Sequence, residues 1–162
     1  MAGGVTSFVA PFLDPSLENK LSGMIQSAGN FLPASPSSTL TGKASVIDGD
    51  TIEIHGQHIR LDGIDAPESA QSCKDADNKR YLCGKDAALF LDRFIAVASP
   101  VRCEFVTWDQ YDRFVGECFR ADGASLNAAM VRSGYALDWQ KHSKGKYAAY
   151  QRDAKQEKVG MW

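Results

Sequence analysis

Residues 44–64 read ASVIDGDTIEIHGQHIRLDGI, and this stretch decides the fold class. Three short runs rich in β-branched residues, at 44–47, 51–55 and 58–64, are separated by an Asp-Gly pair and by a Gly-Gln pair. Dipeptides of this kind are typical of the tight turns that join antiparallel strands. The stretch therefore predicts a three-stranded meander.

Outward from the meander, the pattern predicts two more strands and three helices. Apolar residues at helical spacing predict a helix over 84–97, and two apolar runs predict strands over 101–107 and 113–120. A helix is expected from the N-cap Ser125 to about residue 134, and another over about 144–158. Five strands in a three-plus-two order, with a helix between the third and fourth, are typical of an OB-type barrel. We expect an α+β fold: a five-stranded OB-fold β-barrel with about three helices packed on it.

Residues 1–40 differ from the rest in composition. They carry few charges and end in a proline- and serine-rich stretch at 33–38, which is typical of a linker. Apolar residues at helical spacing over 15–28 predict one short helix, with a frayed arm as the open alternative. We therefore expect an N-terminal helical arm and linker over 1–40 and one domain over 41–162. No apolar run approaches the roughly 18 residues that a membrane-spanning helix needs.

The charge of the chain places a limit on how it can bind a polyanion. The formal net charge is -2, so the molecule as a whole lacks the positive potential typical of a basic nucleic-acid-binding domain. Any such binding must depend on a local surface. One basic run near the C-terminus leaves two alternatives open, a solvated helical face or a surface that steers nucleic acid. Its members are Lys141, His142, Lys144, Lys146, Arg152, Lys155 and Lys158.

The four cysteines are better explained as disulfides than as a zinc site, because none shows the C-x2-C spacing. If the turn at 109–112 closes a hairpin, Cys103 stands directly opposite Cys118, within bonding reach. Cys73 and Cys83 would then close the intervening loop. Two bridges predict an oxidising compartment, periplasmic or extracellular, and four reduced thiols in a cytosolic protein remain the alternative.

Acidic and basic side chains at the predicted strand ends suggest phosphodiester chemistry. Asp50 and Asp65 are suited to a hard divalent cation such as Ca2+, which takes oxygen ligands. Arg60 and Arg113 offer paired donors that fit phosphate oxygens and can neutralise charge developing on phosphorus. Glu68 is then available to activate or position an attacking water. Taken singly, each of these residues has a structural explanation, as a turn residue or an ion pair.

Three ordered motifs carry a resemblance to a known family. They are DGDT at 48–51, RLDGIDAPE at 60–68 and DQYDR at 109–113. Over about residues 41–162 the chain resembles the thermonuclease family, the staphylococcal-nuclease-like OB-fold nucleases. Asp112 departs from that pattern, because the family has glycine before the arginine.

The resemblance implies a role for each site residue. It makes Asp50, Asp65 and the backbone carbonyl of Ala66 the Ca2+ ligands. It makes Arg60 and Arg113 the phosphate-binding pair and Glu68 the catalytic carboxylate. It also places Asp109, Tyr111 and Trp139 at the nucleotide site.

The function implied by the resemblance is a calcium-dependent endonuclease. Members of the family cleave DNA and RNA and leave 3'-phosphate ends, so DNA or RNA is the expected substrate. The alternative is a catalytically silent OB-fold module that binds nucleic acid or a protein partner. Retention of Arg60, Arg113 and Glu68 favours the enzyme, because degenerate members lose an arginine or the glutamate.

Overall fold

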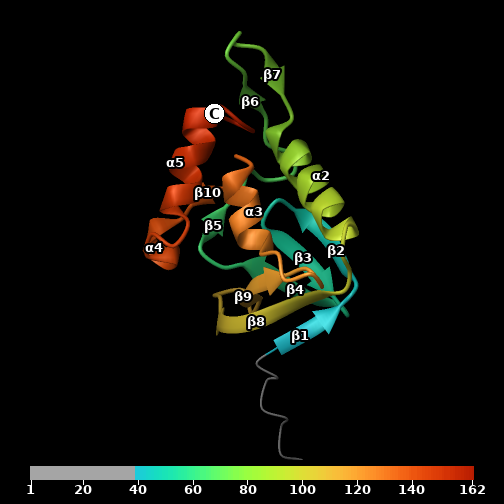
Figure 1. Ribbon diagram of the computed structural model, residues 1–162. Coiled ribbons are helices and arrows are strands. Elements are labelled where there is room, and N and C mark those ends of the chain that lie inside the picture. The colour runs from blue at the N-terminus through green and yellow to red at the C-terminus, as the bar shows by residue number, and fades with distance from the viewer. Residues whose placement is uncertain (1–38) are drawn as a thin grey trace, which may run out of the picture. The chain divides into compact units, whose positions relative to one another are not determined.

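A strongly curled β-sheet forms the centre of the protein (Figure 1). The structure, a computed structural model, describes residues 39–162, so the expected helix at 15–28 and the linker lie outside the described residues. The sheet has six strands in the order β1-β8-β9-β4-β3-β2. They are β1 (Thr39–Gly42), β2 (Ala44–Asp48), β3 (Thr51–Ile54), β4 (Gln57–Leu61), β8 (Val101–Trp108) and β9 (Phe114–Phe119).

The first two strands are halves of one bent strand, because only Lys43 separates them. β1 pairs with β8 and β2 pairs with β3, so this bent strand joins the two ends of the sheet. At the bend, a Cβ on Gly42 would lie 2.6 Å from Ile54 Cγ2, so glycine is needed for the close approach. With β4 and β9 paired in parallel, the arrangement confirms the expected five-stranded OB-fold barrel.

The helices pack on one another beside the barrel, with α3 between α2 and α5 (Figure 1). Their bounds are α2 (Cys83–Ala96), α3 (Leu126–Arg132), α4 (Gln140–Ser143) and α5 (Ala148–Glu157). The expected N-cap is confirmed, because the Ser125 side chain accepts a hydrogen bond from the backbone N–H of Ala128. The short helix α4 was not expected from the sequence. None of the helices in residues 39–162 is both long and apolar enough to cross a bilayer.

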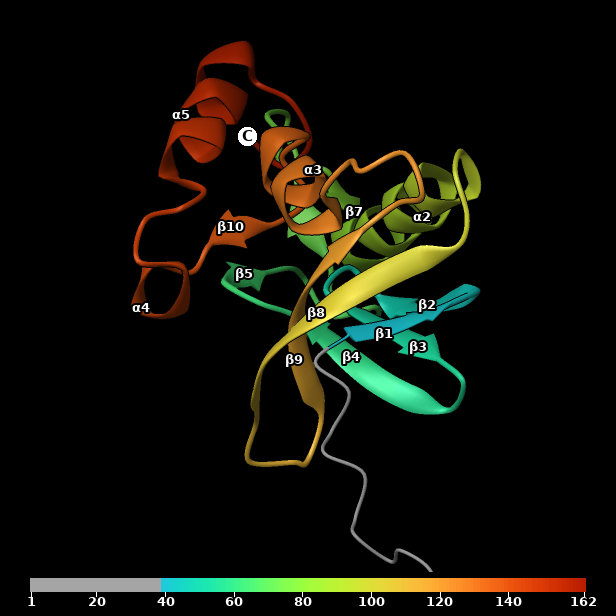
Figure 2. The same ribbon diagram turned by 60° about the horizontal axis from the view of Figure 1, so that its bottom comes forward.

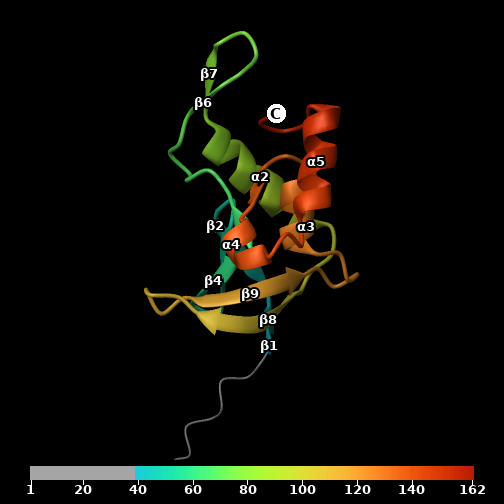
Figure 3. The same ribbon diagram turned by 90° about the vertical axis from the view of Figure 1, so that its left-hand side faces the viewer.

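Two small strand pairs lie outside the main sheet. β5 (Ile64–Asp65) pairs with β10 (Leu137–Asp138), and Figure 2 shows this pair beside α4. β6 (Cys73–Lys74) pairs with β7 (Arg80–Tyr81), and this hairpin extends from the first turn of α2 (Figure 3). The first pair carries part of the candidate site described below, and the second lies at the start of α2.

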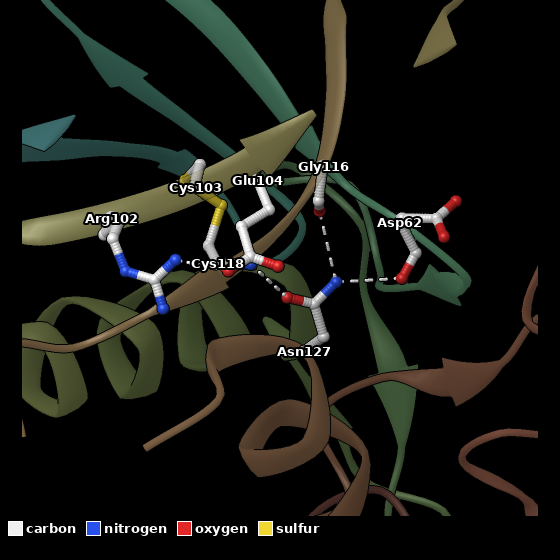
Figure 4. Close-up of a disulfide and its surroundings, with 7 residues drawn as sticks. All are labelled: Asp62, Arg102, Cys103, Glu104, Gly116, Cys118 and Asn127. Atoms are coloured by element: carbon white, nitrogen blue, oxygen red, sulfur yellow. Dashed lines mark hydrogen bonds and ion pairs between the residues drawn. A yellow bond between two sulfur atoms is a disulfide. The ribbon is translucent and has the colours of Figure 1, made fainter. Parts of the chain in front are cut away.

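A buried amide joins the helices to the barrel (Figure 4). Asn127 on α3 is fully buried, and its Oδ1 accepts the backbone N–H of Cys118 at 3.0 Å. Its Nδ2 donates to the backbone carbonyls of Asp62, at 2.9 Å, and Gly116, at 3.4 Å. Both the amide nitrogen and the carbonyl oxygen of this side chain are thereby hydrogen-bonded, as a buried polar group requires. The contacts fix α3 against β9 and against the turn that follows β4.

Both expected disulfides are confirmed. Cys103 lies directly opposite Cys118 in the β8–β9 ladder, and the two are bonded (Figure 4). Cys73 and Cys83 are bonded across the β6–β7 hairpin. No free cysteine is left among the described residues.

Removing the Cys103–Cys118 bridge should lower the free energy of unfolding by about 3 kcal/mol. The bridge closes a loop of 15 residues in the unfolded chain, and the loss of loop-closure entropy accounts for that amount. Urea denaturation of Cys103→Ala/Cys118→Ala measures it. A change below about 1 kcal/mol would show that the bridge does not constrain the unfolded state.

Candidate active site

Asp50 is a buried carboxylate at the turn between β2 and β3. The residue is 4% exposed, and its Oδ2 accepts the backbone N–H of Ala66 at 3.0 Å. The hydroxyl of Thr51 donates to Oδ1 at 3.1 Å. Burial raises the pKa of Asp50 to about 6, although the Arg60 guanidinium and the Ala66 N–H both lower it. Because burial disfavours its charged form, Asp50 needs a cation such as the Arg60 guanidinium beside it when it is ionised.

Arg60 brings the two aspartates to one place. It lies on β4 opposite Thr51, and its Nη1 forms an ion pair with Asp50 Oδ1. Its Nη2 lies 3.4 Å from Oδ1 of Asp65. Asp50 and Asp65 therefore both contact the guanidinium of Arg60, although they are 15 residues apart in the sequence. The close β-turn between β4 and β5 makes this possible.

A second arginine stands at the end of the neighbouring strand. Arg113 immediately precedes β9, whose Phe114 pairs with Ile59 of β4, the residue before Arg60. Asp109 holds it in place, because the Arg113 Nε donates to Asp109 Oδ2 at 2.7 Å. Burial raises the pKa of Asp109, but hydrogen bonds from the backbone and side chain of Arg113 lower it more, so the net pKa is below the ordinary value. Asp109 is therefore an orienting anion for Arg113.

One cleft of about 600 Å³ contains most of the predicted site. It lies beside the β8–β9 turn, the turn after β4, and α4. Six of the residues expected at the site line it: Arg60, Glu68, Asp109, Tyr111, Arg113 and Trp139. Asp50, Asp65 and Ala66 are connected to it through their contacts with Arg60 and with one another. The structure thus brings all nine residues into one neighbourhood.

Aromatic rings flank both arginines. The Arg60 Cζ lies 5.5 Å from the centroid of the Trp139 ring, and the Arg113 Cζ lies 5.6 Å from that of Tyr111. Tyr111 is 71% exposed, so its ring is available to a ligand. Guanidinium and aromatic groups side by side suit a phosphate with an attached base.

The cleft has further lining residues that the sequence did not single out as site residues. Trp108, the last residue of β8, is 45% exposed and packs against Phe105 and Phe114. The one sequence feature that could have indicated Trp108 as a site residue is its position directly before Asp109. Lys141 and His142, the first residues of the basic run, also line the cleft. Their placement favours the steering alternative for these two residues.

The donor set fits a hard cation only in part. Asp50 and Asp65 both offer carboxylate oxygens, the ligands that a hard cation prefers, and both contact Arg60. Among residues 39–162, no three His, Cys, Asp or Glu side chains form a group that could hold a metal ion. Ca2+ takes roughly six to eight oxygen ligands. An ion here would therefore need backbone carbonyl, water or substrate oxygens in addition to the two carboxylates.

Asp112 adopts a backbone conformation that explains why glycine suits this position. Its φ is 56°, in the left-handed region, and it ends the turn between Asp109 and Arg113. Asparagine tolerates that conformation as well as aspartate does, but it carries no charge. On the expectation that Arg113 binds a phosphate of the substrate, Asp112→Asn should lower KM for an oligonucleotide about two- to fivefold, because the carboxylate beside Arg113 repels that phosphate.

The measurement for Asp112 is steady-state cleavage at low and high salt. The decrease in KM should be largest at low salt, since exposed charges are screened. Asp112→Gly, which also relieves the backbone conformation, should raise the unfolding temperature in addition. An unchanged KM in both variants at low salt would mean that the Asp112 charge does not reach the substrate.

Comparison with known proteins gives one family match. The model of the family described as "Staphylococcal nuclease homologue" matches residues 58–162. This range includes the Arg60, Glu68 and Arg113 positions.

Several individual proteins are similar to the chain. The "Succinoglycan biosynthesis protein ExoI" of Rhizobium meliloti (strain 1021) is 49% identical over 123 residues, covering 76% of this chain and 64% of that protein. An "Uncharacterized endonuclease" of Escherichia coli O157:H7 is 32% identical over 122 residues, covering 72% of each chain. "Endonuclease YhcR" of Bacillus subtilis (strain 168) is 28% identical over 131 residues, covering 72% of this chain but 11% of that protein. The chain thus spans less than two thirds of the ExoI and YhcR lengths.

Proposed function

This chain belongs to the staphylococcal nuclease family, and on that premise we propose that it is a calcium-dependent nuclease that hydrolyses phosphodiester bonds in DNA and RNA. One observation carries the proposal: Arg60, Arg113 and Glu68 line a single cleft, and two aspartates converge beside it. Relatives named as endonucleases support it.

The residues divide the reaction among them. Arg60 and Arg113 bind the oxygens of the phosphate and neutralise the charge that develops on it. Glu68 accepts a proton from the attacking water, whose oxygen forms a bond to phosphorus. The bond from phosphorus to the 5'-oxygen breaks, and that oxygen takes up a proton. The products are a 3'-phosphate and a 5'-hydroxyl.

Asp50, Asp65 and the backbone carbonyl of Ala66 are the proposed ligands of Ca2+. When bound, the ion supplies positive charge next to the phosphate. The remaining residues of the cleft act on the nucleotide: Tyr111 and Trp139 offer ring faces to a base. Asp109 keeps Arg113 in position through its carboxylate.

The experiment that tests the function uses the oxidised protein with plasmid DNA and with a single-stranded oligonucleotide. We expect fragments of both. Their 3' ends should block extension by a polymerase until a phosphatase removes the phosphate. Retarded migration of the oligonucleotide without any cleavage would instead support the silent binding module.

Calcium binding should weaken as the pH falls below about 6. Asp50, with a pKa of about 6, must lose its proton to bind the ion, so its protonation competes with Ca2+. The expected loss of affinity is about tenfold per pH unit below that value, and Asp50 contributes no pH dependence well above it. The charged groups next to Asp50 are Arg60, which favours ionisation, and Asp48, which opposes it.

Titration calorimetry with CaCl2 below, near and above pH 6 measures this dependence. The same pKa shift should make the stability of the metal-free protein depend on pH. Because the folded state holds the Asp50 proton more tightly than the unfolded chain, this group makes the free energy of unfolding fall as pH rises from 3.8 to about 6. Calcium affinity that stays constant through this range would exclude Asp50 as a ligand.

Two disulfides support a proposal about location. Bridges of this kind persist in oxidising surroundings, so we place the protein in the periplasm or outside the cell.

A further inference from the structure

Two hydrogen bonds to Gln71 hold the backbone of Glu68 in a tight turn. The N–H of Gln71 donates to the carbonyl of Glu68 at 2.7 Å, which closes the turn over 68–71. In return, the Oε1 of the Gln71 side chain accepts the N–H of Glu68 at 3.2 Å. Both backbone polar groups of Glu68 are therefore bonded to one residue. Because Glu68 and Gln71 are both exposed, no packing around the side chains explains this order.

The first turn of α2 lies directly against this turn. The N–H of Gly84 donates to the carbonyl of Gln71 at 3.3 Å. A Cβ on Gly84 would collide with the carbonyl oxygen of Glu68 and would lie 3.0 Å from the Cα of Ser69. Gly84 has no left-handed φ, so glycine is needed here for the close approach and not for backbone conformation. The backbone of Glu68 thus rests on the start of a helix.

A disulfide fixes the same two segments to one another. Cys73, two residues after Gln71, is bonded to Cys83, the first residue of α2, with 5.5 Å between their Cα atoms. Figures 1 and 3 both show the β6–β7 hairpin at this end of α2. The helix is anchored in turn by its buried Ala87 and Leu91. The turn is also tied to the barrel, because the hydroxyl of Ser69 donates to the carbonyl of Ile47 at 3.0 Å.

We propose that Gln71, Gly84 and the Cys73–Cys83 disulfide form a clamp that positions the Glu68 carboxylate in the cleft. The proposal rests on the proposed function, in which Glu68 accepts the proton of the attacking water. These are positioning residues: they act on the backbone of Glu68 and do not touch substrate. The segment from 68 to 72 is exposed, and without the clamp it is free to move away from the phosphate.

The clamp predicts a particular effect of Gly84→Ala. Alanine is favourable inside a helix, so the variant should keep its helix content. The collision with backbone atoms should lower its unfolding temperature, so kcat is measured well below that temperature. The added methyl group must displace the carbonyl of Glu68. We expect kcat to fall about 100-fold, because a shift of about 1 Å at a reacting group has an effect of that size. KM should stay within about twofold of the wild-type value, since Arg60 and Arg113 are unmoved, and Ca2+ affinity should stay within about twofold because Asp50 and Asp65 are unmoved.

Two further variants keep the test independent of any single substitution. Cys73→Ala/Cys83→Ala should lower kcat and leave KM unchanged. Cys103→Ala/Cys118→Ala is its matched control, because this variant removes the other disulfide, which lies inside the barrel. Gln71→Ala removes the acceptor for the Glu68 N–H. Gln57→Ala is its control, because Gln57 lies in the β3–β4 hairpin outside the cleft and its Nε2 donates to the carbonyl of the adjacent His58. The control variants should keep the wild-type kcat.

Hydrogen exchange measures the clamp without any nuclease assay. The amides of Gln71 and Gly84 should exchange slowly in the oxidised wild type and at least about tenfold faster in the Cys73→Ala/Cys83→Ala variant. Unchanged exchange in that variant, or faster exchange with an unchanged kcat, would overturn the clamp. A wild type that cleaves no nucleic acid would overturn the proposed function instead, and exchange would still decide whether the turn is clamped.

Discussion

Glu68→Gln is expected to lower kcat by about 10²–10⁴-fold while KM changes less than about twofold. The substitution keeps the size and the hydrogen-bonding shape of the side chain but removes its ability to accept a proton. Glu68 lines the cleft and is exposed, so the neutral amide costs no buried ion pair and should leave the unfolding temperature unchanged. Loss confined to kcat is the signature of a group that acts in the transition state.

Steady-state cleavage of a single-stranded oligonucleotide gives both constants for this variant. Glu53→Gln is the matched control, because Glu53 is on β3 and its neighbour His58 is on the adjacent strand, outside the cleft. It should behave as wild type. A parallel rise in KM for Glu68→Gln would assign Glu68 to substrate binding, and an unchanged kcat would remove it from the reaction.

Arg113→Ala is expected to lower kcat/KM by about 10²–10³-fold, the usual effect of losing one donor to a developing negative charge. In the proposed reaction Arg113 binds the phosphate and also neutralises it, so both kcat and KM should change. Arg113→Lys keeps the charge but not the paired donors and should recover only part of the loss. Asp109 then loses its partner, and its pKa should rise toward the ordinary value.

Arg102→Ala is the control for this second variant. Arg102 lies on β8, is paired with Glu104 and stacks near Phe119, so it matches Arg113 in chemistry without lining the cleft. Its loss should leave kcat/KM within about twofold. Equal effects of both variants would point to a general loss of positive charge instead of a specific phosphate contact.

The barrel could be predicted from the sequence because its signals are local. Alternating β-branched residues and Asp-Gly or Gly-Gln turns define the meander within 21 residues, and Ser125 marks the start of α3 by its own side chain. The cysteine pairing on β8 and β9 followed from the hairpin between them. The bent strand at Gly42 could not be predicted, because the need for glycine there comes from Ile54, across the sheet.

The candidate site was predictable as a set of residues but not as an arrangement. Motif order identified Asp50, Arg60 and Glu68, whereas the shared contact of the two aspartates with Arg60 depends on how β4 turns into β5. Trp108 had no signal apart from its neighbour Asp109. Gly84 and Glu68 are 16 residues apart in the sequence and come into contact because of the way α2 packs. No local sequence pattern predicts that contact.

Cleavage of an end-labelled single-stranded oligonucleotide, with wild type and Glu68→Gln purified side by side, tests the central claim most directly. Each protein is assayed with Ca2+, with excess chelator, and with Ca2+ restored. We expect the wild type to cleave with Ca2+, to stop with chelator and to recover, and Glu68→Gln to remain nearly inactive throughout. Wild-type protein that produces no calcium-dependent fragments, or a variant that cleaves equally fast, would contradict the assignment of this site as a nuclease.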